Sequence, residues 1–278
     1  MDTLSMERFI PVPGGRLFAI SEGDGPPIVL LHAAIAHHKA WDAMVPGLVD
    51  SGFRVVRYDL RSFGVSPTDD VEFSARADLI AVLDDFGIDR AALVGNSRGG
   101  EIALDTAVEF PERVVAVVGV GAGLSGFESE PTAEERVIYR EWMRLAKAGE
   151  PDREQMIDLE VRLWVDGPGQ PRGRVDDAIR ESVRTMNRPL HRAERVQGRP
   201  ISLDPPSNSR LADLRCPVMA VAGALDLSDV AATARRLEEA APNARAVVWP
   251  DVAHMIGMEV PTRLNELIVD FLAPLRPW

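Results

Sequence analysis

Short, uninterrupted apolar runs recur along this 278-residue chain and alternate with segments that have the period of a helix. Runs without polar alternation are typical of strands that are covered on both faces, as in parallel sheets. Strands and helices in this order predict right-handed crossovers and a doubly wound, mostly parallel α/β sheet. The expected strands are residues 28–31, 53–58, 91–94, 114–120, 218–222 and 246–249.

Several helices between these strands carry end signals. Residues 75–86 have apolar positions at helical spacing, with Ser74 as the expected N-cap and Gly87 as the residue that ends the helix. A last helix should begin near Pro261, because a missing amide hydrogen does no harm in a first turn. Residues 9–22 instead alternate around a double-glycine turn, which predicts an antiparallel hairpin at the sheet edge.

The alternation of strands and helices fails between residues 124 and 213, where we find only helical patterns and loops rich in Pro and Gly. This predicts a helical cap, 124–213, inserted into a core domain formed by residues 1–123 and 214–278. Because the insertion follows one strand and precedes another, it should lie over the carboxyl ends of the strands, where open α/β sheets bind ligands.

Charge and cysteine content exclude several classes of partner. The chain has 43 acidic and 31 basic side chains, a formal charge of −12, which disfavours nucleic acid and anionic membranes as partners. A lone cysteine, Cys216, excludes an intrachain disulfide, and residues 1–8 lack the apolar core of a signal peptide. No apolar run has the roughly 20 residues of a membrane span. We therefore expect a cytoplasmic protein, of an oligomeric state that the sequence does not indicate.

The segment 91–110 contains the candidate nucleophile. An apolar strand is followed by Gly-Asn-Ser-Arg-Gly and then by a helix-forming run, which matches the G-x-S-x-G pattern. Small residues two positions before and after Ser97 allow a turn so tight that the serine side chain projects alone above the sheet. The alternative is a simple turn or a phosphate-binding loop, so the assignment of Ser97 depends on its partners.

A serine hydroxyl needs a base to take its proton and a carboxylate to orient that base. Of the five histidines, only His254 lies in a loop that follows a strand whose carboxyl end shares the edge of Ser97. Asp226 similarly follows an apolar strand, which gives the chain order Ser97, Asp226, His254. Asp229 or Asp251 could be the acid instead, Asp226 could be only a helix N-cap, and His254 could be a core histidine.

Tetrahedral intermediates also need backbone amides that stabilise an oxyanion. One should be the amide of Arg98, at the N-terminus of a helix, and the other the amide of Ala34, in the loop after the strand 28–31. His37 and His38 are neighbours, but no third ligand stands near them in the sequence, so we expect no metal site. No cofactor is required for this chemistry.

These residues together resemble the α/β-hydrolase superfamily over nearly the whole chain. The Leu-Leu-His-Ala-Ala segment at 30–34 is similar to its oxyanion loop, 59–66 to its Asp-x-Arg-Gly-x-Gly-x-Ser segment, and residues 223–226 and 253–255 to its acid and histidine segments. The resemblance implies that the helical insertion is a cap over the substrate pocket. Ala33 and Ser62 depart from the family pattern, because each stands where the family has glycine.

The resemblance also narrows the chemistry. Haloalkane dehalogenases and epoxide hydrolases of this fold use aspartate at the position of Ser97, which rules against both activities. We expect a serine hydrolase that cleaves a small carboxylic ester or lactone through an acyl-enzyme. Alternatives are a carbon–carbon bond hydrolase of ring-fission diketones, suggested by Gly-Asn-Ser-x-Gly-Gly, a cofactor-free perhydrolase or haloperoxidase, and a ligand receptor without catalysis.

Three cap residues are candidates for substrate contact: Trp142, Arg162 and Trp164. For both tryptophans, packing of a helix face against its neighbours is the competing interpretation.

Overall fold

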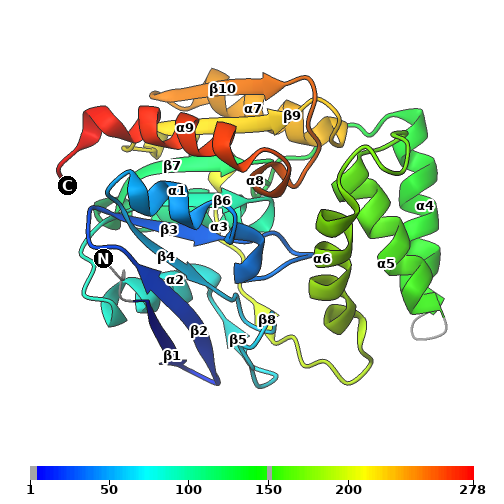
Figure 1. Ribbon diagram of the computed structural model, residues 1–278, viewed down its shortest axis with the longest axis horizontal. Helices are drawn as coiled ribbons and strands as arrows, with labels where there is room; N and C mark the ends of the chain where they lie inside the picture. The colour runs from blue at the N-terminus through cyan, green and yellow to red at the C-terminus, as the bar shows by residue number, and fades with distance from the viewer. Residues whose placement is uncertain (1–4, 149–151) are drawn as a thin grey trace.

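An eight-stranded sheet forms the centre of the computed structural model, which describes residues 5–148 and 152–278 (Figure 1). Its strands are β1 (Met6–Val12), β2 (Gly15–Glu22), β3 (Pro27–Leu31), β4 (Arg54–Tyr58), β6 (Ala91–Asn96), β7 (Val114–Val120), β9 (Val218–Gly223) and β10 (Ala244–Trp249). They lie side by side in the order β1-β2-β4-β3-β6-β7-β9-β10. β1 and β2 form the expected antiparallel hairpin, β2 pairs antiparallel with β4, and all other neighbours are parallel. The predicted doubly wound, mostly parallel sheet is therefore confirmed.

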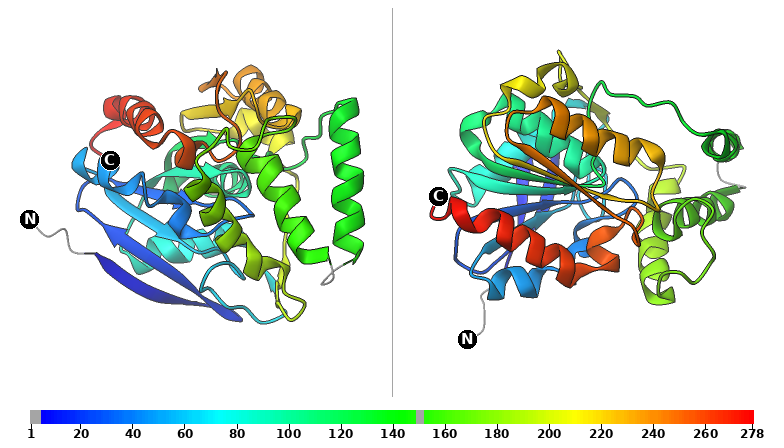
Figure 2. Two further views of the ribbon diagram at one scale, coloured as in Figure 1. Left: turned by 45° about the vertical axis from the view of Figure 1, so that its right-hand side comes forward. Right: turned by 90° about the horizontal axis from the view of Figure 1, so that it is seen from above.

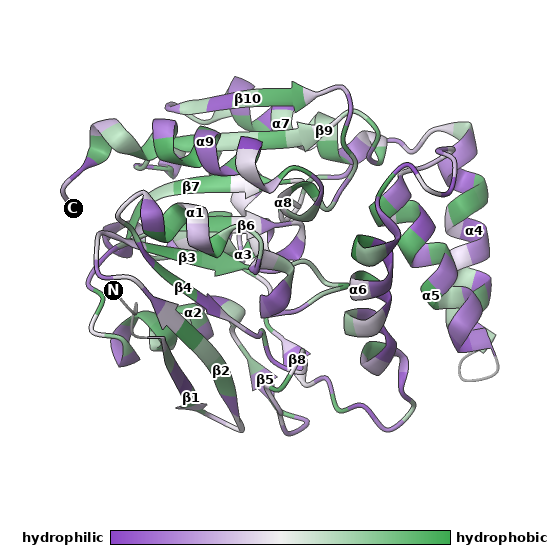
Figure 3. Ribbon diagram, viewed as in Figure 1, coloured by the Kyte–Doolittle hydropathy of each residue, from purple (hydrophilic) through white to green (hydrophobic). Residues whose placement is uncertain are grey.

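Helices cover both faces of the sheet, which explains why the central strands are hydrophobic along their length (Figure 3). On one face lie α2 (Ala75–Asp85), α3 (Arg98–Glu109) and α7 (Ser228–Ala240), and on the other α1 (Val45–Asp50) and α9 (Pro261–Leu272). Successive residues of β3 point to opposite faces of the sheet. Val29 packs in the hydrophobic core under α2, α3 and α7, and Leu30 packs in the core under α1 and α9. β10 differs from expectation, because it is an edge strand on which Val248 is 41% exposed.

The end signals of α2 are confirmed. The Ser74 side chain accepts a hydrogen bond from the amide of Ala77 at 3.2 Å, and Gly87 has the left-handed backbone (φ 63°) that ends helices.

The insertion contains the expected helices and places them beyond the carboxyl ends of the strands (Figures 1 and 2). These helices are α4 (Ala133–Ala148), α5 (Arg153–Val161), which continues into a π-helical turn over Arg162–Asp166, and α6 (Asp177–Asn187). A short helix, α8 (Ile256–Glu259), follows the loop of His254. No described helix is both long and apolar enough to cross a membrane.

The last part of the insertion is not only helical, contrary to the sequence pattern. A two-residue strand, β8 (Arg199–Pro200), pairs with β5 (Glu72–Phe73), which precedes α2. Leu203 and Leu211 then pack into the same core cluster as α3. A strand of two residues has no detectable period, so the sequence could not indicate this pairing.

Glycines at the start of α3 allow this helix to lie against the sheet. A Cβ at Gly95 would stand 2.2 Å from the carbonyl oxygen of Gly99, and a Cβ at Gly99 would stand 2.2 Å from the carbonyl oxygen of Leu31 in β3. Backbone atoms of a central strand cannot move aside easily. These glycines therefore allow α3 to pack closely against β3 as well as β6.

We predict that Gly99→Ala lowers the free energy of unfolding by about 1–3 kcal/mol, because the new methyl group overpacks the contact with Leu31. Denaturant unfolding measures the change. Gly87→Ala is the control: nothing lies within 4 Å of the new Cβ, although the positive φ of Gly87, unlike the helical backbone of Gly99, itself disfavours alanine. A loss for Gly99→Ala no larger than that for the control would contradict this account.

Candidate active site

Ser97 stands at the turn between β6 and α3 in a strained backbone conformation. Its φ is 54° and its ψ is −116°, a region that residues with a Cβ rarely adopt and that costs about 1–3 kcal/mol. The backbone around it is tightly held, because Ser97 donates its amide hydrogen to Val120 at 2.9 Å and its carbonyl accepts from Glu101 and Gly123 at 3.0 and 3.1 Å. Neighbouring strands therefore maintain the conformation that exposes the hydroxyl.

His254 and Asp226 form a buried pair. The Nδ1 atom of His254 lies 2.6 Å from Oδ2 of Asp226, and the two side chains are 6% and 0% exposed. The other oxygen of Asp226 accepts the amide hydrogen of Leu227 at 2.8 Å, so the carboxylate is fixed on both sides. An orientation of this kind leaves Nε2 as the atom of His254 available to a reacting group.

The structure distinguishes among the acids that the sequence left open. Asp251 forms an exposed ion pair with Arg263 at 3.0 Å. Asp229 lies near enough to His254 to act on its charge, but the hydrogen bond to the ring comes from Asp226. Asp226 is not the N-cap of α7, because Leu227 occupies that position.

Ser97 and His254 line the same cavity, whose volume is about 470 Å³. Trp164 of the insertion also lines it, with its ring 6.4 Å from that of His254. Trp142 instead donates its indole hydrogen to Glu160 at 3.1 Å, which joins α4 to α5. Neither Trp142 nor the exposed Arg162 is among the described residues that line this cavity.

Several carboxylates line the cavity, of which the sequence analysis named only Asp229. Glu101 of α3, Glu135 of α4 and Asp229 of α7 all line it. Burial raises the pKa of Glu101, as does the nearby charge of Asp105. Burial and the charge of Asp226 likewise raise the pKa of Asp229. The approach to Ser97 from this side is therefore acidic.

Asn96 is a further residue that the sequence analysis missed. Its side-chain amide donates to the carbonyl oxygens of Val120 at 2.8 Å and of His254 at 3.1 Å. Asn96 precedes the nucleophile directly, so it joins the serine turn to the histidine loop, which is 158 positions away in the chain. Only its place within the Gly-Asn-Ser motif could have drawn attention to it.

The charge state of His254 depends on its partner. Burial lowers the pKa of His254, but the negative charge and the hydrogen bond of Asp226 outweigh this effect and raise the pKa above its usual 6.5. A raised pKa means that the pair stabilises the protonated ring, which is the charge state of a base that has just accepted a proton.

The candidate oxyanion loop is held by His32. This buried ring lies with Nδ1 at 2.8 Å from the carbonyl oxygen of Ala33, and its Nε2 accepts the amide hydrogen of Leu60 at 3.0 Å. Nδ1 therefore carries the proton and donates it. Because the carbonyl and amide of one trans peptide point in opposite directions, a bond to the Ala33 carbonyl directs the amide of Ala34 away from His32.

The departures from glycine in the family pattern have different consequences. Among the described residues, only Ser62 and Ser97 combine a side chain with a positive φ, and Ser62 has φ 67°. Ala33 is therefore not strained in this way, although it is buried. The amides of Ala34 and Arg98 make no backbone hydrogen bond within residues 5–148 and 152–278, so both remain available to an oxyanion.

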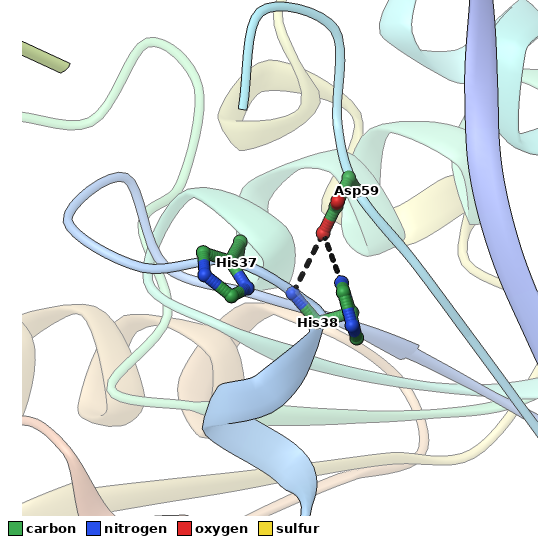
Figure 4. A group of neighbouring side chains, drawn as sticks. All are labelled: His37, His38 and Asp59. Atoms are coloured by element: carbon green, nitrogen blue, oxygen red, sulfur yellow. Dashed lines mark hydrogen bonds and ion pairs between the residues drawn. The ribbon is translucent and has the colours of Figure 1, made fainter. Parts of the chain in front are cut away.

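His37 and His38 have a third potential ligand after all. Asp59, at the end of β4, lies beside them, and one nitrogen or oxygen from each side chain lies within 4.8 Å of the others (Figure 4). Such a group could hold a metal ion. Asp59 is already engaged, however: Oδ1 accepts from Nδ1 and the amide of His38 at 2.6 and 2.9 Å, and Oδ2 accepts from the amide of Val65 at 2.9 Å. The sequence analysis missed the grouping because Asp59 follows β4 and stands 21 positions from His38 in the chain.

Comparison with known proteins establishes the family. Residues 26–261 match the model of the alpha/beta hydrolase fold family, so the chain belongs to that family. It is a hydrolase of α/β fold. One relative is epoxide hydrolase B of Mycobacterium tuberculosis, 26% identical, with 98% of this chain and 99% of the relative covered.

A second relative has a different printed activity, as a 2-hydroxy-6-oxononadienedioate/2-hydroxy-6-oxononatrienedioate hydrolase of Paraburkholderia phymatum. It is 27% identical, with 88% of this chain and 86% of the relative covered. Among solved structures, a carboxylesterase of Bacillus subtilis has a TM-score of 0.73 at 20% identity, with 98% of this chain and 93% of that chain covered. That likeness shows the fold alone.

We predict that acid destabilises the protein partly through His32. Burial lowers the pKa of His32 to about 4 from 6.5, so the folded state favours the neutral ring. This contribution to stability is complete above pH 6.5 and is lost as the pH falls through 4, a difference of about 3 kcal/mol. His32→Gln, which does not titrate, should therefore lose less stability than the wild type between about pH 7 and about pH 4.5.

Urea unfolding at both pH values measures the difference. The matched control is His191→Gln, which removes a partly exposed histidine of the insertion that is bonded to Glu160. An identical acid-induced loss in the wild type and in His32→Gln would refute a neutral His32.

Proposed function

We propose that the protein is a serine hydrolase that cleaves a small carboxylic ester or lactone through an acyl-enzyme. The observation that carries the proposal is that Ser97, in a strained turn, faces the same cavity as a histidine already paired with a buried aspartate. A serine hydroxyl, a base and an orienting carboxylate are the groups that nucleophilic acyl transfer requires.

The proposed reaction has two steps. The Ser97 hydroxyl attacks the carbonyl carbon while His254 takes its proton, and Asp226 stabilises the resulting imidazolium. The amides of Arg98 and Ala34 stabilise the oxyanion, and His254 then returns the proton to the leaving oxygen. A water molecule, activated by His254, attacks the acyl-enzyme and releases the acid. The helical insertion 124–213 acts as a cap over the core 1–123 and 214–278, and its Trp164 ring lies 6.4 Å from the ring of the base.

Ser97 argues against the activity of the epoxide hydrolase relative. Attack of a serine oxygen on an epoxide carbon would form an ether, which has no carbonyl group for water to attack. An aspartate nucleophile forms an ester in the same reaction, and water can hydrolyse that ester. Turnover would therefore stop after one cycle with Ser97 as the nucleophile.

Carbon–carbon bond hydrolysis is the second candidate. It is favoured by the Gly-Asn-Ser-x-Gly-Gly sequence at the turn and by the relative named for cleaving an oxo-diene dicarboxylate. A panel of short esters, lactones and vinylogous diketones separates the two activities by their kcat/KM values. If no compound of the panel is turned over, the result indicates a ligand receptor that keeps Ser97, Asp226 and His254 without catalysis.

We predict that Ser97→Ala reduces kcat for short p-nitrophenyl esters by about 10⁴-fold or more, because no other nucleophile replaces the hydroxyl. The same change should abolish labelling by a fluorophosphonate probe, detected by mass spectrometry. Ser129→Ala removes another hydroxyl from the same cavity and should retain the label. Undiminished turnover by Ser97→Ala would disprove the assignment.

We predict that kcat/KM rises with pH through an apparent pKa above 6.5, because His254 must be neutral to accept the proton and Asp226 raises its pKa. In Asp226→Asn, only the smaller effects of Asp229 and Glu259 still oppose burial, so this apparent pKa should fall, and kcat should decrease by about 10⁴-fold. Asp251→Asn, which changes an exposed carboxylate in the loop of His254, serves as the control. A pH profile unchanged by Asp226→Asn would exclude Asp226 as the partner of the base.

A further inference from the structure

A second, smaller pocket lies beside the first turn of α3, where Ser97 and Glu101 line the larger cavity. Its volume is about 80 Å³, which is the space of two or three water molecules at about 30 Å³ each and suits a carboxylate group. Arg98 and Ile102 of α3 line it, together with residues that follow β4 and with the segment 195–200 that returns from the insertion. Since Arg98 directly follows Ser97, this pocket adjoins the turn that holds the candidate nucleophile.

The pocket carries an excess of positive charge. Of its lining arginines, Arg61 is neutralised by a bidentate ion pair with Asp78, at 2.6 and 2.8 Å. Arg98 and Arg195 form no ion pair within the described part of the chain. Arg195 donates only to neutral acceptors, the carbonyl oxygens of Ser62 at 3.1 Å and Leu190 at 3.3 Å.

The neighbouring charges affect one another. Burial lowers the pKa of Arg195, and the positive charge of Arg98 lowers it further. Glu101 lies near enough to Arg98 for their charges to interact, but Arg195 and Arg98 still repel each other, and an anion between them would remove that repulsion.

A buried hydroxyl lies in the same pocket. Tyr58 lines it, is fully buried, and its hydroxyl has no hydrogen-bond partner among the described residues. Burial raises the pKa of Tyr58, so the hydroxyl keeps its proton and can donate. A buried donor without an acceptor destabilises the folded protein, and a bound anion would supply the missing acceptor.

The larger cavity, which Ser97 lines, has the opposite character, because Glu101, Glu135 and Asp229 line it. A substrate with a negatively charged group is repelled there and attracted toward Arg98 and Arg195. The pocket and the cavity therefore differ in charge.

We propose that this arginine pocket binds a carboxylate carried by the substrate, so that the preferred substrates are monoesters of small dicarboxylic acids or lactones that bear a carboxylate. The inference rests on the proposed function, because it assumes acyl transfer at Ser97. Arg195 and Tyr58 act as positioning residues for the anionic end of the acyl group, and the leaving alcohol occupies the acidic cavity.

The experiment compares monomethyl with dimethyl esters of glutaric, adipic and pimelic acid, which differ by one charge at each chain length. The wild type should have the higher kcat/KM for the monomethyl ester of at least one acid. Arg195→Met should lower this preference by about tenfold or more, the factor for a lost hydrogen bond to a charged group, because kcat/KM falls more for the monomethyl than for the dimethyl ester. Arg192→Met, an exposed arginine outside the pocket, should keep the preference.

A second variant separates loss of the pocket's function from misfolding of the protein. Tyr58→Phe removes only the unpartnered hydroxyl, so its free energy of unfolding should not fall, yet its preference for the charged ester should. Inhibition by the free dicarboxylates and by inorganic phosphate shows whether the pocket prefers a carboxylate to other anions. Competitive inhibition by the dicarboxylate alone supports an acyl subsite, and equal or stronger inhibition by phosphate overturns it.

Failure of this inference is distinguishable from failure of the proposed function. If the neutral esters are cleaved and Ser97 is labelled, but the charged esters are not preferred, the subsite is refuted and the serine hydrolase stands. If no ester is cleaved, calorimetric titration with glutarate still tests whether the pocket binds a carboxylate. Binding that Arg195→Met abolishes and Arg192→Met retains supports an anion site, and absence of binding to the wild type overturns it.

Discussion

The close approach of α3 to the sheet is the constraint on which the candidate site depends. Gly95 and Gly99 allow the chain to reverse within a few residues, and the amide of Ser97 is fixed to Val120 of the neighbouring strand β7. The left-handed conformation of Ser97 costs free energy, and these contacts offset it. The exposed hydroxyl is therefore a consequence of packing in the sheet, and any change that moves α3 outward would also move the nucleophile.

The same region positions the base. Asn96 bonds to the carbonyl of His254, and Gly121, which follows β7, leaves room for the ring: a Cβ there would stand 3.2 Å from Nδ1 of His254. Three loops at the carboxyl edge of the sheet are thus joined by side-chain and backbone contacts before any substrate binds. Such preorganisation is what electrostatic stabilisation of a transition state requires.

The sequence predicted features that depend on local patterns. The apolar runs, the Ser74 N-cap and the strand-turn-helix at Ser97 are properties of neighbouring residues, and the structure confirms these elements. Pairings between distant residues that no motif or strand end indicates could not be predicted. Asp59 beside His38, β8 beside β5 and the charged lining from α4 and α7 bring together segments far apart in the chain, and no single-sequence period encodes them.

Glu135 shows how the insertion and the acidic cavity are related. Its carboxylate accepts the amide and the hydroxyl of Ser228 at 2.6 and 2.7 Å, at the first residue of α7, where the helix dipole favours an anion. Burial raises the pKa of Glu135, but hydrogen bonds from Ser228 and Thr132 outweigh it and lower the pKa overall. The carboxylate therefore stays ionised and serves two purposes, since it attaches α4 to the core and keeps one wall of the cavity negative. Since Ser97 and His254 line the same cavity, the attachment of α4 also fixes part of the negative charge around the candidate nucleophile.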